Sequence, residues 1–238
     1  MQIDKRSNKF SRRTLIAAAG GGAIAAGLSS NLLIPSRTIA AAPVSGEKIS
    51  ADKALKLLME GNQRYSSYKL LHPRQDEKRL IEVAKGQNPF AIILTCADSR
   101  VCPEIIFDQG LGDLFVVRVA GNVVNDMILG SIEYAAGHLG ALLIMVLGHE
   151  RCGAVAAAVE GAQVPAHISS LVKAIQPAVE TIKGKAGDSL DNAIRANVQM
   201  VVAQMKTSEP LAGMVKTKNL QIVGGRYDLD KGAVEIIT

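Results

Sequence analysis

The sequence predicts one α/β domain with a mainly parallel central sheet, helices on its faces and one antiparallel edge strand. Three short apolar runs are bounded by glycine and charged residues, as is typical of strands buried on both faces of a parallel sheet: 90–96, 113–120 and 141–149. Between the last two runs, residues 127–140 have helical spacing and supply a crossover. The stretch 220–237 predicts two strands joined by a turn around Asp230–Gly232, hence the antiparallel pair.

Further helices are predicted before the first strand and after the third. An amphipathic helix follows Ser50, a good N-cap, and a more polar helix over 73–89 is closed by Gly86, so that an N-terminal helical arm spans about 50–85. Another helix begins at Cys152 or Gly153, and 168–205 predicts more helix. The length suits one sizeable domain, which we place at 43–238.

The basic character of the chain is confined to its first residues. The formal net charge is +5, but six of the 27 basic residues and one of the 22 acidic residues lie in 1–42, which leaves 21 of each in the remainder. The body is therefore neutral, has no tryptophan and has few aromatic residues, so we expect no nucleic-acid partner.

Residues 1–42 have the order of an export signal. A basic start with the pair Arg12 and Arg13 precedes an apolar stretch, 15–28, which four glycines dilute, and an A-x-A-like site ends at Ala42. This pattern resembles the twin-arginine type and predicts cleavage after Ala42 and a periplasmic location, or the thylakoid lumen if the source is a photosynthetic bacterium. The alternative is an uncleaved anchor, for which the stretch is short compared with the usual ~20 residues. Contact with a membrane is expected only through this signal.

Three cysteines, Cys96, Cys102 and Cys152, are too few for a disulfide framework in an exported protein, but they suit a metal site. Cys96 ends one predicted strand, and His149 ends another, three residues before Cys152. Ligands of open α/β sheets collect at such carboxyl ends, and two thiolates with one imidazole form the three-ligand, open pattern of catalytic zinc. Only Cys102 could close the set; we expect it to be a small buried residue near a helix N-cap. The H-x-x-C spacing alone is a weak signal and favours a buried cysteine beside a histidine with satisfied hydrogen bonds over a metal site.

Longer motifs strengthen the zinc interpretation. The stretches CADSR at 96–100 and GHERCG at 148–153 resemble the β-class carbonic anhydrases nearly letter for letter, as do GNQRY at 61–65, DLFVVRVAGN at 113–122 and GSIEYA at 130–135. The resemblance covers most of 50–238 and implies the β-carbonic anhydrase fold. It also implies reversible hydration of carbon dioxide to bicarbonate and a proton by a zinc-bound hydroxide, with one Zn²⁺ per chain held by Cys96, His149 and Cys152.

The resemblance further implies a role for each remaining site residue. Asp98 would accept the hydrogen of the hydroxide, and Arg100 would hold Asp98 ionised and turned away from the metal, although a local salt bridge is the simpler reading of this pair alone. Gln87, nine positions before the first zinc cysteine, would donate a hydrogen bond to the substrate, and the backbone N–H of Gly153 would be a second donor. The apolar wall of the substrate pocket would consist of Phe115, Ala120 and Tyr134. In a second family pattern the aspartate swings onto zinc; the match at Gln87 favours the open form.

The same resemblance implies a homodimer or a multiple of dimers, whose leading helices embrace the partner and whose pockets draw residues from both chains. Two other functions remain open: a hydrolase acting on CS₂ or COS with the same ligands, and a non-catalytic sensor, which is expected to lack Asp98 or Arg100. A proton shuttle is not singled out among His72, His138 and His167.

Overall fold

A five-stranded sheet forms the centre of the protein, in the order β2-β1-β3-β4-β5. The computed structural model describes residues 48–217 and 219–238, so the predicted export signal lies outside the described residues. The strands are β1 (Ala91–Thr95), β2 (Leu114–Arg118), β3 (Leu143–His149), β4 (Gln221–Tyr227) and β5 (Val234–Ile236). β1 to β4 are parallel and β5 pairs antiparallel with β4, which confirms the predicted fold class.

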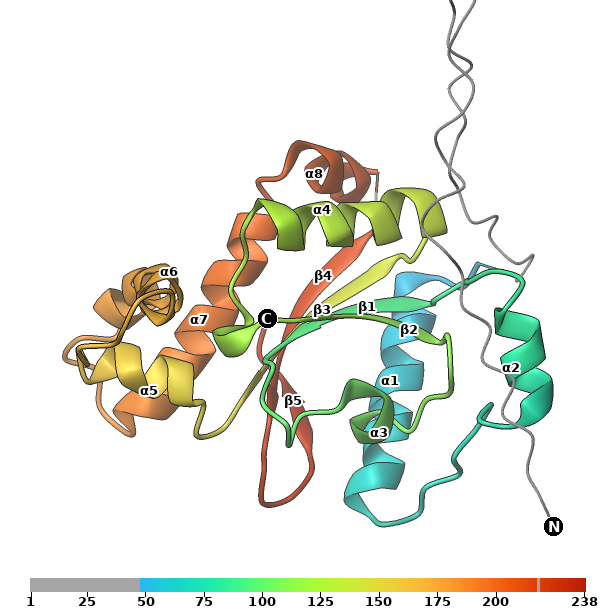
Figure 1. The fold of residues 1–238 in the computed structure, drawn as a ribbon, viewed down its shortest axis with the longest axis horizontal. Helices are drawn as coiled ribbons and strands as arrows, with labels where there is room; N and C mark the ends of the chain where they lie inside the picture. The colour runs from blue at the N-terminus through green and yellow to red at the C-terminus, as the bar shows by residue number, and fades with distance from the viewer. Residues whose placement is uncertain (1–47, 218) are drawn as a thin grey trace, which may run out of the picture. The chain divides into compact units, whose positions relative to one another are not determined.

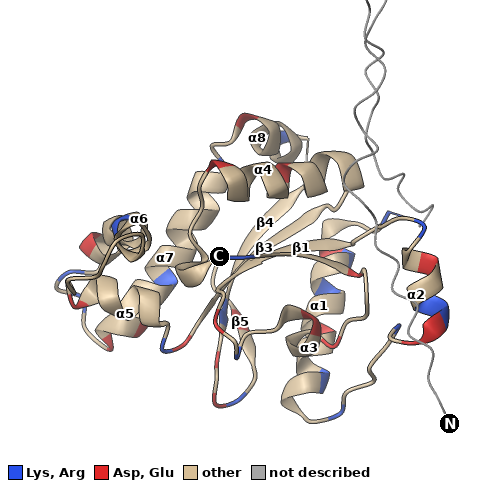
Figure 2. Ribbon diagram, viewed as in Figure 1, with Lys and Arg blue, Asp and Glu red and all other residues tan. Residues whose placement is uncertain are grey.

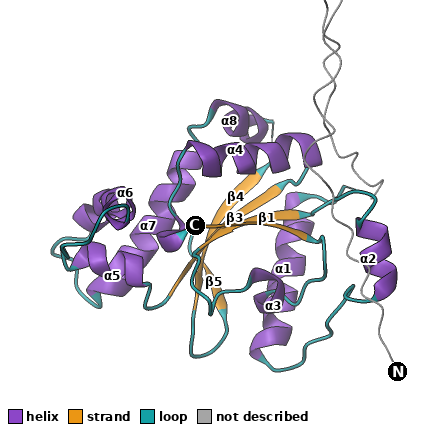
Figure 3. Cartoon of the chain, in the orientation of Figure 1, coloured by secondary structure: helices purple, strands orange, loops and turns teal. Residues whose placement is uncertain are grey.

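Helices cover both faces of this sheet (Figure 1, Figure 3). They are α1 (Ala51–Ser66), α2 (Glu77–Val83), α3 (Pro103–Ile106), α4 (Asp126–Tyr134), α5 (Gly153–Val159), α6 (Ile168–Thr181), α7 (Ser189–Met205) and α8 (Glu209–Lys216), with a 3₁₀ turn at Ala120–Asn122 and a π-helical turn at Ala135–Leu139. Within the described residues, no helix is both long and apolar enough to cross a membrane.

Successive side chains along the strands point to opposite faces of the sheet, so the core has two layers. Ile92 and Leu94 of β1 pack with residues of α4, α7 and α8, whereas Ile93 points to the opposite face and packs with α1 and α3. β1 and β3 are buried along their whole length, as their unbroken apolar sequences predict. A third cluster joins α5, α6 and α7 beside the carboxyl ends of these strands.

Charged residues of both signs share the same helices and loops, as the balanced composition of the body predicts. Figure 2 shows Lys and Arg beside Asp and Glu on α1 and α2. The ion pairs Lys56–Glu60 and Arg79–Glu82 lie on these helices.

The differences from the predicted elements lie in the helices. The segment 168–205 forms two helices, because the connection between them contains Gly184 and Gly187 in the left-handed region. α2 ends at Val83, three residues before the glycine expected to close it. α8 was not predicted; Ser208 precedes it, and a proline lies in its first turn, where no N–H is needed.

Gly61 lets α1 approach the end of α3, and this contact predicts a large effect on stability. A Cβ at Gly61 would lie 1.7 Å from the carbonyl oxygen of Phe107, which is backbone and cannot rotate away. We expect Gly61→Ala to lower the free energy of unfolding by about 3 kcal/mol. The control is Gly130→Ala on α4, where a Cβ meets nothing within 4 Å, and where alanine should raise stability by up to about 1 kcal/mol. Urea unfolding measures both; equal stability of Gly61→Ala and the natural chain would contradict this packing.

Candidate metal centre and active site

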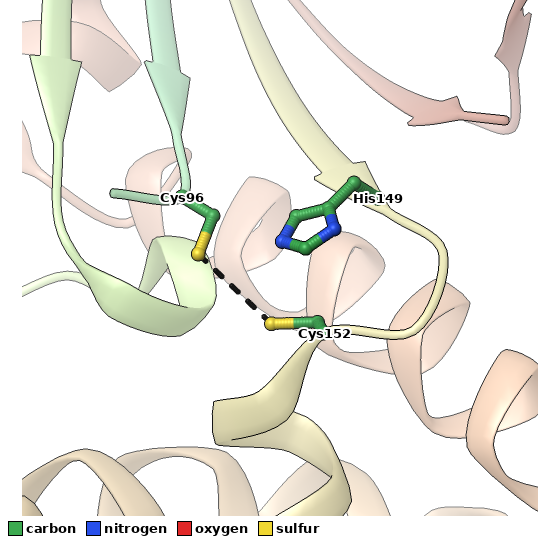
Figure 4. Close-up of side chains that lie close together, drawn as sticks. All are labelled: Cys96, His149 and Cys152. Carbon is green, nitrogen blue, oxygen red and sulfur yellow. Dashed lines mark hydrogen bonds between the residues drawn. The ribbon is translucent and has the colours of Figure 1, made fainter. Parts of the chain in front are cut away.

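Three potential metal ligands meet where β1 and β3 end. Thr95 pairs with Leu147 in the sheet, so Cys96, directly after β1, and His149, the last residue of β3, emerge at the same edge. Cys152 is the N-cap of α5, and the turn before it brings its thiol back toward the sheet (Figure 4). The Sγ atoms of Cys96 and Cys152 are 4.0 Å apart, and one donor atom from each of the three residues lies within 4.8 Å of the others.

The size and chemistry of this donor set fit Zn²⁺. Zinc–sulfur bonds of about 2.3 Å in a tetrahedron place two thiolates roughly 3.8 Å apart, close to the observed separation. All three side chains are buried, and none of the three cysteines forms a disulfide. Three protein ligands leave a fourth position open, which is the arrangement of catalytic rather than structural zinc.

The imidazole of His149 has the tautomer that a metal ligand needs. Its Nδ1 lies 2.8 Å from the carbonyl oxygen of Glu150, which can only accept a hydrogen bond, so Nδ1 carries the proton. Nε2 therefore has a free lone pair in the neutral ring. That atom is buried and has no hydrogen-bond partner among the described residues. A buried polar atom without a partner is costly, and a metal ion bound to Nε2 removes this cost.

The two buried thiols share a proton between them. The hydrogen bond from Cys152 lowers the pKa of Cys96 to about 4, and the same hydrogen bond, followed by burial, raises the pKa of Cys152. These opposite shifts describe one pair that loses its first proton easily and its second with difficulty. Both thiols would be held as thiolates by a divalent cation at this point, which would take the place of the shared proton.

Asp98 and Arg100 form a two-pronged ion pair beside the donor set. Arg100 Nε and Nη2 donate to the two carboxylate oxygens of Asp98 at 2.9 and 2.8 Å, and the Arg100 backbone N–H donates at 2.9 Å. These hydrogen bonds hold the pKa of Asp98 well below its usual range, so Asp98 is ionised at neutral pH. Asp98 Oδ2 lies 3.8 Å from Nε2 of His149, at the border of the site.

Two residues that donate hydrogen bonds to the segment after β1 were not among the predicted site residues. Arg118, at the end of β2, donates to the carbonyl oxygens of Cys96 and Asp98 at 3.1 and 2.6 Å. The N–H of Gly121 donates to Cys96 Sγ at 3.3 Å, a contact that favours the thiolate. The sequence signal that could have indicated Arg118 is its position as the one charged residue at the end of an otherwise apolar strand.

The predicted substrate-binding residues fall into two places. Ala120 adjoins Gly121, and Gly153 adjoins Cys152, so both lie next to the donor set. Phe115 and Tyr134, whose ring centroids are 6.5 Å apart, lie toward the amino ends of the strands. Gln87 lies there too, because it precedes Phe90, whose N–H pairs with Asp113 at the start of β2.

The length of the sheet separates the second group from the metal ligands of the same chain. At about 3.3 Å per residue, Cys96 lies roughly 16 Å from Ala91, where β1 begins, and about 13 Å from Ile92, which pairs with Phe115. No side chain spans either distance. Gln87, Phe115 and Tyr134 therefore do not reach the donor set of their own chain.

The remaining cysteine and histidines stay apart from the donor set. Cys102 is the N-cap of α3, as expected, but it is only half-buried, and its Sγ lies 3.9 Å from a carboxylate oxygen of Glu104. Within the described residues, the donor set includes neither Cys102 nor a second histidine. His138 packs its ring 5.4 Å from that of Tyr134.

The fold and this site define an α/β protein with a buried donor set of two thiols and one imidazole at the carboxyl edge of a parallel sheet. The family model described as carbonic anhydrase matches residues 91–234. Carbonic anhydrase 2 of Mycobacterium tuberculosis is 42% identical over 184 residues, which cover 75% of this chain and 89% of that protein.

Solved structures agree with the sequence match. The Coccomyxa β-carbonic anhydrase, solved in complex with acetazolamide, is 26% identical, with a TM-score of 0.62 over 77% of this chain and 86% of that one. A tetrameric β-carbonic anhydrase of Sordaria macrospora, at 22% identity, shares the fold with a TM-score of 0.64 over 78% of this chain and 97% of that one. The chain belongs to the β-class carbonic anhydrases, and it is an enzyme of that family.

Proposed function

We propose that the enzyme hydrates carbon dioxide reversibly to bicarbonate and a proton at a Zn²⁺ ion held by Cys96, His149 and Cys152. The observation that carries this proposal is Nε2 of His149, which is buried, has no hydrogen-bond partner in the described part of the chain, and faces two thiols 4.0 Å apart. Carbonic anhydrase is itself the standard example of what zinc supplies when bound, since the ion lowers the pKa of a coordinated water to about 7 and so provides a nucleophile at neutral pH.

Asp98 orients the nucleophile in this proposal. Its carboxylate is kept ionised by Arg100, and it borders the open position, so it accepts the hydrogen of the attacking hydroxyl group and turns the oxygen lone pair toward the carbon of carbon dioxide. Arg100 acts by holding both carboxylate oxygens, which keeps Asp98 from turning toward the metal position. A non-catalytic sensor has no need of this pair.

The substrate pocket is completed by a second copy of the chain. Ala120 and the N–H of Gly153 belong to the side of the pocket built by the chain that holds the metal. Gln87 as hydrogen-bond donor and Phe115 and Tyr134 as apolar wall come from the partner, because the length of β1 separates them from their own donor set by about 13 Å or more. We therefore propose a homodimer, or a multiple of dimers, as the active species.

Stopped-flow measurement of carbon dioxide hydration tests the proposed reaction. The chain from Pro43 is assayed with zinc quantified on the same sample. Rapid hydration at about one zinc per chain is the expected result. A full zinc complement without hydration from neutral to mildly alkaline pH contradicts it, and CS₂ and COS are then the substrates to assay.

The proposed two-chain pocket predicts complementation between two inactive variants. Cys152→Ser removes a zinc ligand from one chain, and Gln87→Ala removes the donor that the other chain contributes. In a mixed dimer, the Gln87→Ala chain holds zinc and receives Gln87 from its partner, which rebuilds one complete site. Random mixing makes half of the dimers mixed, so about a quarter of the natural activity per chain is expected.

The control for complementation is a mixture of Cys152→Ser with Cys96→Ser, in which every site lacks a ligand. That mixture should stay inactive. If the Cys152→Ser and Gln87→Ala chains mix, as mass spectrometry of the dimers can verify, and hydration does not rise, the pocket is built within one chain.

We also propose that the chain is exported through the segment 1–42. The support is its order of basic residues, diluted apolar stretch and A-x-A-like site. Export of a folded protein would allow the thiols to receive zinc before they meet an oxidising compartment. Cell fractionation with Arg12→Lys/Arg13→Lys as the variant tests this: the variant should remain in the cytoplasm, and equal export of the two chains contradicts the twin-arginine route.

A further inference from the structure

The turn between His149 and Cys152 is held by hydrogen bonds and an ion pair to the β4–β5 hairpin. The Glu150 N–H donates to the carbonyl oxygen of Tyr227 at 3.0 Å, and the Glu150 carboxylate accepts from the N–H of Leu229 at 3.0 Å. Arg151, which has a left-handed φ of 51°, pairs with both carboxylate oxygens of Asp230 at 2.8 and 2.7 Å. This turn carries two of the three metal ligands, so its position sets their geometry.

Arg226 is the charged side chain that ties this turn to the sheet and to α7. It lies on β4 opposite Gly148, and its side chain is only 13% exposed. Its Nη2 donates to Glu150 Oε1 at 2.6 Å, and its Nε donates to Asp191 Oδ1 of α7 at 2.5 Å. Arg226 thus bridges two carboxylates, with Glu150 on the turn and Asp191 in the first turn of α7.

Arg195 occupies the outer end of the same network without touching the turn. Its Nε donates to Asp191 at 2.8 Å, and its Nη atoms bind the Glu235 carboxylate at 3.1 and 2.7 Å. Arg195 is therefore a matched control for Arg226, because both share Asp191 and only Arg226 contacts Glu150.

Glu150 couples this network to the metal ligand. Its carboxylate is held by Arg226, and its carbonyl oxygen, in the same residue, accepts the Nδ1 proton of His149. Groups that bind the second nitrogen of a ligating histidine fix its tautomer and ring orientation. If the residue shifts, the acceptor moves away from Nδ1, and the lone pair of Nε2 is no longer fixed toward the thiols.

We propose that Arg226 is a positioning residue for the metal centre: by holding Glu150, it keeps the carbonyl oxygen of that residue at Nδ1 of His149, and so keeps the imidazole ring oriented with Nε2 directed at Cys96 and Cys152. This inference rests on the proposed zinc centre. Arg226 makes no contact with substrate in this proposal. Arg226 supports the metal site, whereas Arg195 supports only the fold.

The experiment measures the Zn²⁺ dissociation constant of the chain from Pro43 by competition with a chromophoric chelator at fixed pH, together with the visible spectrum of the Co²⁺-loaded protein. Arg226→Met should weaken zinc binding by about 10- to 100-fold and alter the thiolate-to-cobalt bands. Arg195→Met should leave both unchanged. Arg226→Lys should recover part of the affinity, because an ammonium group can still pair with Glu150 although it cannot bridge to Asp191 in the same way.

Glu150→Gln supplies the second variant, since it preserves size and removes the charge that Arg226 holds. It should weaken zinc binding in the same direction, and the double variant Arg226→Met/Glu150→Gln should bind zinc no more weakly than the weaker single variant. Additive losses, or a natural affinity and cobalt spectrum in Arg226→Met, overturn the inference while zinc binding and hydration by the natural chain leave the proposed function standing. A natural chain that binds no zinc overturns both.

Discussion

Replacing Cys152 with serine should remove zinc and abolish carbon dioxide hydration together. The serine hydroxyl stays protonated at neutral pH and is a much weaker zinc ligand than a thiolate. The site therefore keeps only Cys96 and His149, and two ligands do not hold Zn²⁺ at the affinity of three. Zinc per chain should fall from about one to near zero, and hydration by roughly 10³-fold or more, because the water that the metal activates returns to its ordinary pKa. Elemental analysis and stopped-flow assay of the same sample measure the two quantities.

Cys102→Ser is the matched control for this experiment. It makes the same chemical change at the third cysteine, which is half-buried at the start of α3 and lies outside the donor set. We expect it to keep about one zinc per chain and natural turnover. Stoichiometric zinc with rapid hydration in Cys152→Ser would show that Cys152 is not a ligand, and a loss in Cys102→Ser would show that the ligand set was assigned wrongly.

The fold was predictable because its strands have an unmistakable pattern. β1 and β3 are buried on both faces, so each is a continuous apolar run, and Cys96, directly after β1, and His149, the last residue of β3, stand out as chemically active residues at their ends. α8 was missed because it is short and has a proline in its first turn, where a loop is as plausible from the sequence. The split of 168–205 depended on two glycines whose left-handed conformation the structure shows.

The site was predictable only in part, for a physical reason. Local motifs such as CADSR and GHERCG keep their residues together in the chain, so their meeting follows from where two strands end. The ion pair of Glu150 and Arg226 joins residues 76 positions apart, and no periodicity links them. The tautomer of His149 likewise depends on a backbone carbonyl and leaves no trace in composition or spacing. The separation of Gln87 from the donor set required the direction of β1 in space.

Replacing Arg100 should greatly reduce carbon dioxide hydration without loss of the bound zinc. In Arg100→Met, Asp98 loses two hydrogen bonds from the guanidinium group. Because these bonds lower the pKa of Asp98, that pKa rises toward its ordinary value in the variant. Because Asp98 Oδ2 already lies 3.8 Å from Nε2 of His149, a freed carboxylate can turn into the open position. We expect zinc to remain near one per chain while hydration falls by about 10²-fold, as for loss of a catalytic acid–base group.

Azide binding to the Co²⁺-loaded enzyme distinguishes this closure from a simple loss of Asp98 function. In Arg100→Met the carboxylate competes for the open position, so azide should bind more weakly than in the natural chain. In Asp98→Asn no carboxylate competes, so hydration should fall while azide still binds. Arg100→Lys, which keeps one charged donor, should lie between. Equal azide affinity in Arg100→Met and Asp98→Asn would mean that Arg100 orients the carboxylate without guarding the metal, and full turnover in Arg100→Met would remove the pair from the mechanism altogether.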